Sequence, residues 1–171
     1  MSDASSPTIS PRSLLRHPVH LLSLGLGSGC MRKAPGTWGT VAAVPLYGLI
    51  VWLPSPAYLL LLVLTFVVGI WLCGRTAEAL GVHDHPAIVW DEFVGLWIAL
   101  ALQPTAWEWI LLAFLLFRFF DILKPWPISW LDRRVSGGLG IMIDDVLAGL
   151  LALAAMVLVQ LLLPGVLPPL W

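Results

Sequence analysis

Long apolar runs alternate with short polar segments along this chain, which is the pattern of a helical membrane protein. Five apolar runs can be drawn, over 40–53, 57–74, 93–102, 107–123 and 146–163. Only the second and the fifth reach the roughly 18 residues that a helix needs to cross a hydrocarbon core of about 30 Å. The other three cross only if their polar ends enter the membrane. We therefore predict an all-α bundle with about five membrane-associated helices.

Two proline-containing segments, 54–56 and 103–105, join the first run to the second and the third to the fourth. Both are tight turn signals, so each pair of runs should form a helical hairpin. If the N-terminus is cytoplasmic, the two turns and the C-terminal tail face outward, while 1–39, 75–92 and 118–145 face inward. All nine Lys and Arg residues then lie on the cytoplasmic side, as the positive-inside rule expects.

The composition supports an integral membrane protein of one compact domain. Of the 171 residues, 59% are hydrophobic and only 11% are charged, and the mean hydropathy is +0.92. The formal charge of −1 excludes the basic surface that nucleic-acid binding requires, and no protein partner is evident. The first dozen residues are rich in Ser and Pro, and we expect them to be disordered.

Six of the ten carboxylates lie at or just inside the ends of apolar runs, where an ionised group loses hydration unless a partner replaces the water. They are Asp84, Asp91, Glu92, Asp121, Asp144 and Asp145. The predicted topology brings all six to the cytoplasmic face on three separate segments. Carboxylate oxygens are the ligands that Mg²⁺ prefers, so Asp91, Glu92, Asp144 and Asp145 are candidate ligands for one or two Mg²⁺ ions. Helix N-terminal capping by these acids is the alternative.

The third run, extended from 88 to 103, would make a helix of about 24 Å. This places Asp91 and Glu92 at headgroup depth, at the start of the helix. Gly95 and Gly149 each follow an acid by four residues. In a helix, this spacing places the glycine one turn after the acid on the same face, where it allows a neighbouring helix to approach closely.

Three charged residues end the fourth run at a spacing of three: Arg118, Asp121 and Lys124. This spacing puts them on one helical face before Pro125 stops the helix. A structural salt-bridge ladder would explain the pattern. The catalytic alternative is that Arg118 and Lys124 neutralise a substrate phosphate while Asp121 completes a metal shell or orients water.

A short glycine-containing segment precedes the first run and could bind an anion through backbone N–H groups, hydroxyl groups and a cation. The candidate substrate-binding residues are Lys33, Gly36, Thr37, Trp38, Gly39 and Thr40. A plain turn with Thr40 as the helix N-cap explains the same residues.

Four motifs in order give the chain a resemblance to the phosphatidylglycerophosphatase A family, from about Gly25 to Leu163. They are Gly36-Thr37-Trp38-Gly39-Thr40, Ile88-Val-x-Asp91-Glu92-x-x-Gly95, Phe117-Arg118-x-x-Asp121-x-x-Lys124-Pro125-x-Pro127 and Gly138-x-Gly140-Ile-Met-x-Asp144-Asp145-x-x-Ala148-Gly149. The resemblance divides the chain into an N-terminal tail (1–24), a membrane-embedded phosphatase domain (25–163) and a short C-terminal tail (164–171).

The resemblance implies helices packed around a central one, and a Mg²⁺-dependent phosphatase of the bacterial inner membrane. Its reaction removes the terminal phosphate of phosphatidylglycerophosphate, a substrate embedded among membrane lipids, to give phosphatidylglycerol. We expect a multi-pass protein whose active site faces the cytoplasm, with water activated by Mg²⁺ attacking phosphorus. A phosphoenzyme on Asp121 or Asp144 remains the alternative.

A different class of protein, a small divalent-cation or phosphate transporter, is the rival hypothesis. A permeation path should place polar groups throughout the depth of the bilayer. The second and fifth runs offer only Thr65 and Gln160 in their interiors, so the sequence favours the enzyme.

Overall fold

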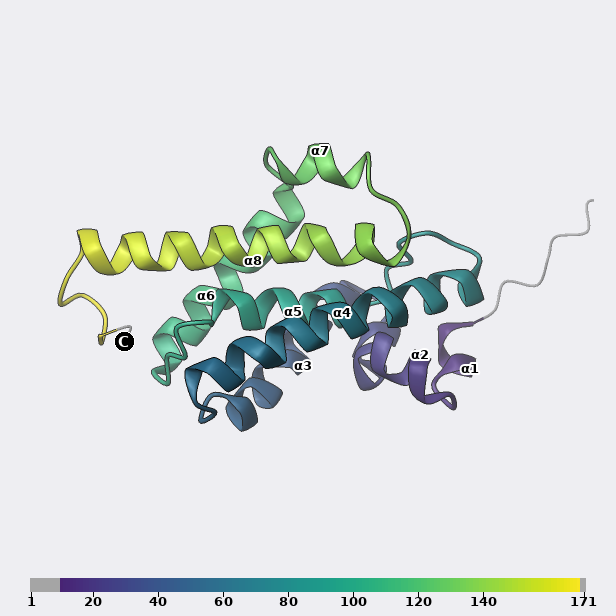
Figure 1. Ribbon diagram of the computed structural model, residues 1–171, viewed down its shortest axis with the longest axis horizontal. Coiled ribbons are helices and arrows are strands. Elements are labelled where there is room, and N and C mark those ends of the chain that lie inside the picture. The colour runs from purple at the N-terminus through teal and green to yellow at the C-terminus, as the bar shows by residue number, and fades with distance from the viewer. Residues whose placement is uncertain (1–9, 170–171) are drawn as a thin grey trace, which may run out of the picture.

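The computed structural model describes residues 10–169, and every regular element in that range is helical (Figure 1). The elements are α1 (Pro11–Leu14), α2 (Pro18–Ser23), the 3₁₀ segment η1 (Gly25–Cys30), α3 (Pro35–Ile50), α4 (Ser55–Leu80), α5 (Trp90–Ala99), α6 (Trp107–Leu123), α7 (Ile128–Asp132) and α8 (Gly137–Leu162). The predicted all-α class is confirmed. The disorder expected for the first dozen residues falls mainly on 1–9, which lie outside the described residues, and it is wrong for Pro11 and Arg12, which begin α1.

Each of the five predicted runs forms a helix, but several ends differ from the prediction. α4 continues to Leu80, and α8 begins at Gly137 rather than Val146. The prediction of a third helix from 88 to 103 is wrong, because α5 covers only Trp90–Ala99. After α5, Gln103 adopts a left-handed conformation (φ 55°), which a continuing helix does not tolerate.

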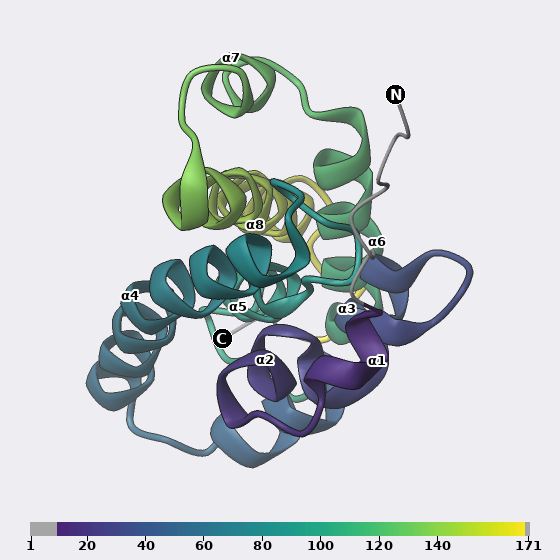
Figure 2. The same ribbon diagram turned by 90° about the vertical axis from the view of Figure 1, so that its right-hand side faces the viewer.

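α5 lies at the centre of the molecule, where it contacts α3, α4, α6 and α8 (Figure 2). Eight of its ten residues are buried, including both acids of its first turn. Phe93 and Leu96 are fully enclosed. Because its neighbours surround it, the acids that it carries are held inside the protein rather than at its surface.

The backbones of α5 and α8 touch, as the positions of their glycines predicted. A Cβ atom on Gly149 would overlap the carbonyl oxygen of Gly95, and one on Gly95 would overlap the ring of Phe117. At the start of α8, a Cβ on Gly138 would likewise overlap the carbonyl oxygen of Ile70 in α4. Small residues thus let α8 pack directly onto two helices.

The two predicted hairpin turns lie side by side and are joined through one glutamine. The Gln103 side-chain amide donates hydrogen bonds to the carbonyl oxygens of Val51 (2.9 Å) and Leu53 (2.7 Å). The Ser55 hydroxyl donates to the Gln103 side-chain oxygen at 2.9 Å. Both turns therefore belong to one end of the bundle, as the predicted topology requires.

Two helices, α4 and α8, are long and apolar enough to cross a membrane, at 26 residues each. Both present exposed leucines along their lengths, among them Leu59, Leu60, Leu150 and Leu158. An extended apolar surface of this kind supports association with a membrane.

Candidate functional site

A cavity of about 300 Å³ opens where α3, α5, α6 and α8 meet the loop that follows α4. It is lined by Ala34, Pro35, Gly36, Asp84, Pro86, Ile88, Asp91, Glu92, Arg118, Asp121, Lys124, Ile141, Asp144 and Asp145. All six carboxylates that the sequence singled out border this one space. The predicted convergence of three separate segments is therefore observed.

Three of these acids form a compact cluster: Asp91, Glu92 and Asp145. One carboxylate oxygen from each lies within 4.8 Å of the others, and the residues are only 7%, 8% and 4% exposed. Asp91 Oδ1, Glu92 Oε2 and Asp145 Oδ2 have no hydrogen-bond partner among the described residues. Buried carboxylates without partners are costly, so the cluster fits a hard divalent cation.

The sequence suggested that Asp144 and Asp145 stand at the mouth of their helix, but the structure places them inside it. α8 begins at Gly137, so both acids lie about two turns inside it. The N–H of Gly137 donates instead to His83 Nε2 at 2.8 Å. Because the influence of the helix dipole fades within the first turn, capping does not explain the pair in α8. Capping still offers an explanation for Asp91 and Glu92, because these acids occupy the first turn of α5.

Arg118 joins α6 to the acids of α5. Its guanidinium forms an ion pair with Asp121 at 2.6 Å and reaches Glu92 at 3.7 Å. The pair with Asp121 has the spacing of a structural ladder, and such a pair is compatible with both the structural and the catalytic alternative. Arg118 nevertheless lines the cavity with its side chain 15% exposed, which leaves it within reach of a bound anion.

Lys124 follows the last residue of α6 in a left-handed conformation (φ 43°). The prediction that it continues the helical face of Asp121 is therefore wrong. Its ammonium donates to Asp144 Oδ2 at 2.7 Å and to Asp132 Oδ1 at 2.9 Å. Burial lowers the pKa of Lys124, but these hydrogen bonds outweigh it and hold the pKa above its usual value. The same bond from Lys124 lowers the pKa of Asp132.

Sequence reasoning missed Asp132 as the second partner of Lys124. α7, which carries Asp132, follows the Pro125–Pro127 turn. A turn with two prolines readily reverses the direction of the chain. The two prolines were therefore the sequence signal that Asp132, eight residues after Lys124, could lie beside it.

The predicted anion-binding segment is the first part of α3 rather than a loop. α3 begins at Pro35, and the Thr40 hydroxyl donates to the carbonyl oxygen of Gly36 at 2.9 Å. Thr40 therefore lies inside the helix, and its assignment as N-cap is wrong. A Cβ on Gly36 would overlap the Glu92 carboxylate and contact the Arg118 guanidinium, so this end of α3 rests directly on the site.

Of the six candidate substrate-binding residues, Gly36 alone lines the cavity. Gly39 is buried against Val89, while Lys33 and Trp38 are exposed beside the start of α3. Thr37 is half-buried next to Gly36. Their contact with substrate stays a prediction.

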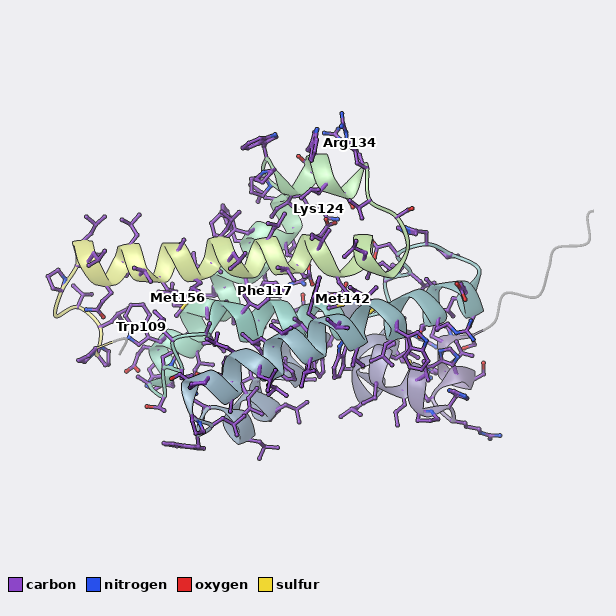
Figure 3. The ribbon with its side chains drawn as sticks, in the orientation of Figure 1. Trp109, Phe117, Lys124, Arg134, Met142 and Met156 are labelled. Carbon is purple, nitrogen blue, oxygen red and sulfur yellow. The ribbon has the colours of Figure 1, made fainter. Side chains whose placement is uncertain are left out.

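In Figure 3, Lys124 and Met142 lie at a similar position along the long axis but on opposite sides of α8, whereas Trp109 and Met156 lie toward one end of the bundle. Phe117 lies between the two groups and is fully buried. The charged site therefore occupies one region along the long axis, and apolar packing fills the region near the hairpin turns.

Comparison with known proteins agrees with these features. The model of the family described as phosphatidylglycerophosphatase A matches residues 21–160. A protein of that name from Escherichia coli is 49% identical over 142 residues, covering 82% of this chain and 83% of the relative. One from Haemophilus influenzae is 49% identical over 148 residues, covering 85% and 91%. No solved structure matches the chain significantly.

Proposed function

The chain belongs to the phosphatidylglycerophosphatase A family, and from this premise we propose how its cavity performs the reaction. The protein hydrolyses phosphatidylglycerophosphate to phosphatidylglycerol and phosphate. The observation that carries the proposal is a set of buried carboxylates, each with an oxygen atom that has no hydrogen-bond partner among the described residues, beside two cations that are ion-paired with neighbouring acids. A phosphatase that acts by electrostatic stabilisation of a phosphoryl group needs these two components.

We propose Mg²⁺ as the cofactor, held by Asp91, Glu92 and Asp145. Support comes from their clustered oxygen atoms and from the absence of hydrogen-bond partners for three of those atoms among the described residues. Asp144 also has one partnerless oxygen, although its other oxygen accepts from Lys124, so it completes the proposed ligand set. When bound, Mg²⁺ supplies positive charge that attracts the phosphate and stabilises the charge that develops on it.

Arg118 and Lys124, which line the same cavity, bind the oxygen atoms of the phosphate. Asp121 fixes the Arg118 guanidinium, and Asp132 and Asp144 fix the Lys124 ammonium. Preorganised cations cost no rearrangement when charge develops in the transition state. The N-terminus of α3, which reaches the cavity at Gly36, adds backbone N–H groups that favour an anion.

We favour attack by water over a phosphoenzyme. The two carboxylates considered as nucleophiles are each engaged by a cation, Asp121 by Arg118 and Asp144 by Lys124. Such pairing stabilises the negative charge of a carboxylate and weakens it as a nucleophile.

We further propose that α3, α4, α5, α6 and α8 form a multi-pass bundle in the bacterial inner membrane, with the cavity facing the cytoplasm. The support is the bacterial origin of the relatives and the position of the hairpin turns at one end of the bundle. The positive-inside rule then assigns the Lys- and Arg-bearing end to the cytoplasm.

Phosphate release from purified protein in detergent tests the reaction and its metal dependence together. We expect turnover of phosphatidylglycerophosphate with Mg²⁺ and none in excess chelator. Asp91→Asn, Glu92→Gln and Asp145→Asn should each lose at least about a hundredfold in kcat. Glu78→Gln is the matched control, because Glu78 is an exposed acid paired with Arg75, and it should keep wild-type activity.

Thermal unfolding separates a lost ligand from a lost fold. Without metal, Asp145→Asn should unfold at a temperature no lower than the wild type, because the amide removes a buried charge that has no partner. Full turnover in chelator, or wild-type activity in most of the three variants, would refute the metal site.

A further inference from the structure

An apolar groove lies between α3 and α6, on a side of the molecule that the reaction described above does not use. Its volume is about 550 Å³. It is lined by Val41, Val44, Pro45, Trp107, Ile110, Leu111 and Phe114. All seven side chains are apolar, and Leu111 and Trp107 are 48% and 67% exposed. The groove is therefore open to the surroundings of the protein along its length.

The groove and the catalytic cavity are both lined by α3 and α6, and on α6 they lie on one face. On α6, Phe114 lines the groove, while Arg118 and Asp121 line the cavity at four and seven residues further on. These spacings correspond to one face of a helix. On α3, Gly36 lines the cavity and Val41 begins the groove. The end of the groove thus lies about one helical turn from the edge of the cavity.

We propose that this groove binds an acyl chain of the phospholipid substrate while the terminal phosphate occupies the cavity. The inference rests on the proposed function, because it takes the phosphate position from the cavity between Gly36 and Arg118. A phosphate held there is covalently attached to an apolar tail, and the groove is an apolar surface that begins one turn from the cavity on the same face of α6.

The dimensions agree with this occupant. From Arg118 to Leu111 the helix rises about 10 Å, and one leaflet of a hydrocarbon core is about 15 Å thick. A chain that starts beside Arg118 can therefore follow α6 past Phe114 to Leu111 within its own leaflet. The groove also lies on the lipid-facing side of the proposed bundle, so a substrate could enter from the membrane between α3 and α6.

Two exposed leucines allow a matched test. Leu111 of α6 lines the groove, whereas Leu64 of α4, which is 52% exposed, lines neither the groove nor the cavity. Leu111→Trp narrows the groove, and Val44→Trp narrows it from the opposite wall. Leu64→Trp adds the same bulk on an apolar surface away from the groove. Each variant is assayed with long-chain phosphatidylglycerophosphate and with its dihexanoyl analogue, whose tails are too short to fill the groove.

We expect kcat/KM for the long-chain substrate, relative to the dihexanoyl analogue, to fall about tenfold in Leu111→Trp and Val44→Trp, mainly through KM. This ratio should stay at the wild-type value in Leu64→Trp. Equal effects at Leu111 and Leu64, or an unchanged ratio in both groove variants, would overturn the proposal. A variant that fails to fold loses activity toward both substrates equally, and the other groove variant then decides on the proposal.

The same experiment distinguishes failure of the proposed function. Wild-type protein that releases phosphate from neither substrate would refute the reaction itself. Photolabelling with long-chain phosphatidylglycerophosphate carrying a diazirine in the acyl chain then decides on the groove. Labels in the segments 41–45 and 107–114 support it, and labels confined to other segments overturn it.

Discussion

At the level of single residues, one backbone conformation decides what Lys124 can do. Lys124 has a left-handed φ of 43° and directly follows Leu123, the last residue of α6. The ammonium then bridges Asp132 of α7 and Asp144 of α8. Lys124 is therefore held at the cavity by two elements, whereas Arg133 and Arg134, which follow α7, are exposed.

This difference predicts unequal effects for two cytoplasmic cations. Lys124→Ala should lower kcat by roughly 10²–10³, because a fixed cation at a transferring phosphoryl group contributes about 3–4 kcal/mol to the transition state. Arg133→Ala should cost no more than about tenfold, since an exposed, screened charge contributes about 1 kcal/mol or less. Phosphate release from both variants measures the contrast. Equal and mild losses would mean that Lys124 only anchors its helix to anionic lipid.

At the level of helices, the position of the acids depends on how closely α8 approaches α5. Gly149 permits that approach, because its Cα lies where a side chain would meet the backbone of Gly95. Asp145, one turn earlier on α8, is thereby brought beside Asp91 and Glu92. Packing of two helices, rather than a loop, assembles the proposed ligands.

Two glycine substitutions test this dependence. Gly149→Ala should destabilise the protein by about 1–3 kcal/mol, because the added methyl group forces the two helices apart. Gly48→Ala in α3 is the control. A Cβ there meets no atom within 4 Å, so alanine should stabilise by up to about 1 kcal/mol through its higher helix propensity. Thermal unfolding in detergent measures both changes, and a stable Gly149→Ala variant with normal activity would contradict the close-packing argument.

At the level of the whole molecule, the hairpin turns and the charged residues of the cavity lie in different regions of the bundle. The hairpin turns form one end of the bundle through the bonds of Gln103, and the charged cavity lies away from them along the long axis (Figure 3). A substrate anchored in the membrane would meet the cavity at the depth of its own headgroup.

Reporter fusions test the proposed orientation. Alkaline phosphatase, which is active only outside the cytoplasm, should be active when fused after Gln103 and inactive when fused after Arg134. The physical reason is that the cationic segment resists translocation across the membrane, whereas the hairpin turn between α5 and α6 does not. The reverse pattern would place the cavity on the outer side.

The sequence alone determined the helical class, the five apolar runs and the set of acids that meet at the cavity. These features depend on local quantities, namely the hydropathy of a segment and the cost of placing a carboxylate beside it. The spacing of Gly95 and Gly149 after their acids also predicted the close approach of two helices, because that pattern follows from helix geometry.

Only the tertiary structure decided which acids share one cluster and which pair with a cation. Asp144 and Asp145 are adjacent in sequence, yet Asp145 joins the acids of α5 while Asp144 binds Lys124. The direction of each side chain follows from the start of α8 at Gly137. That start depends on contacts with His83 and Ile70, which lie more than 50 residues earlier in the chain, and no local pattern records such contacts.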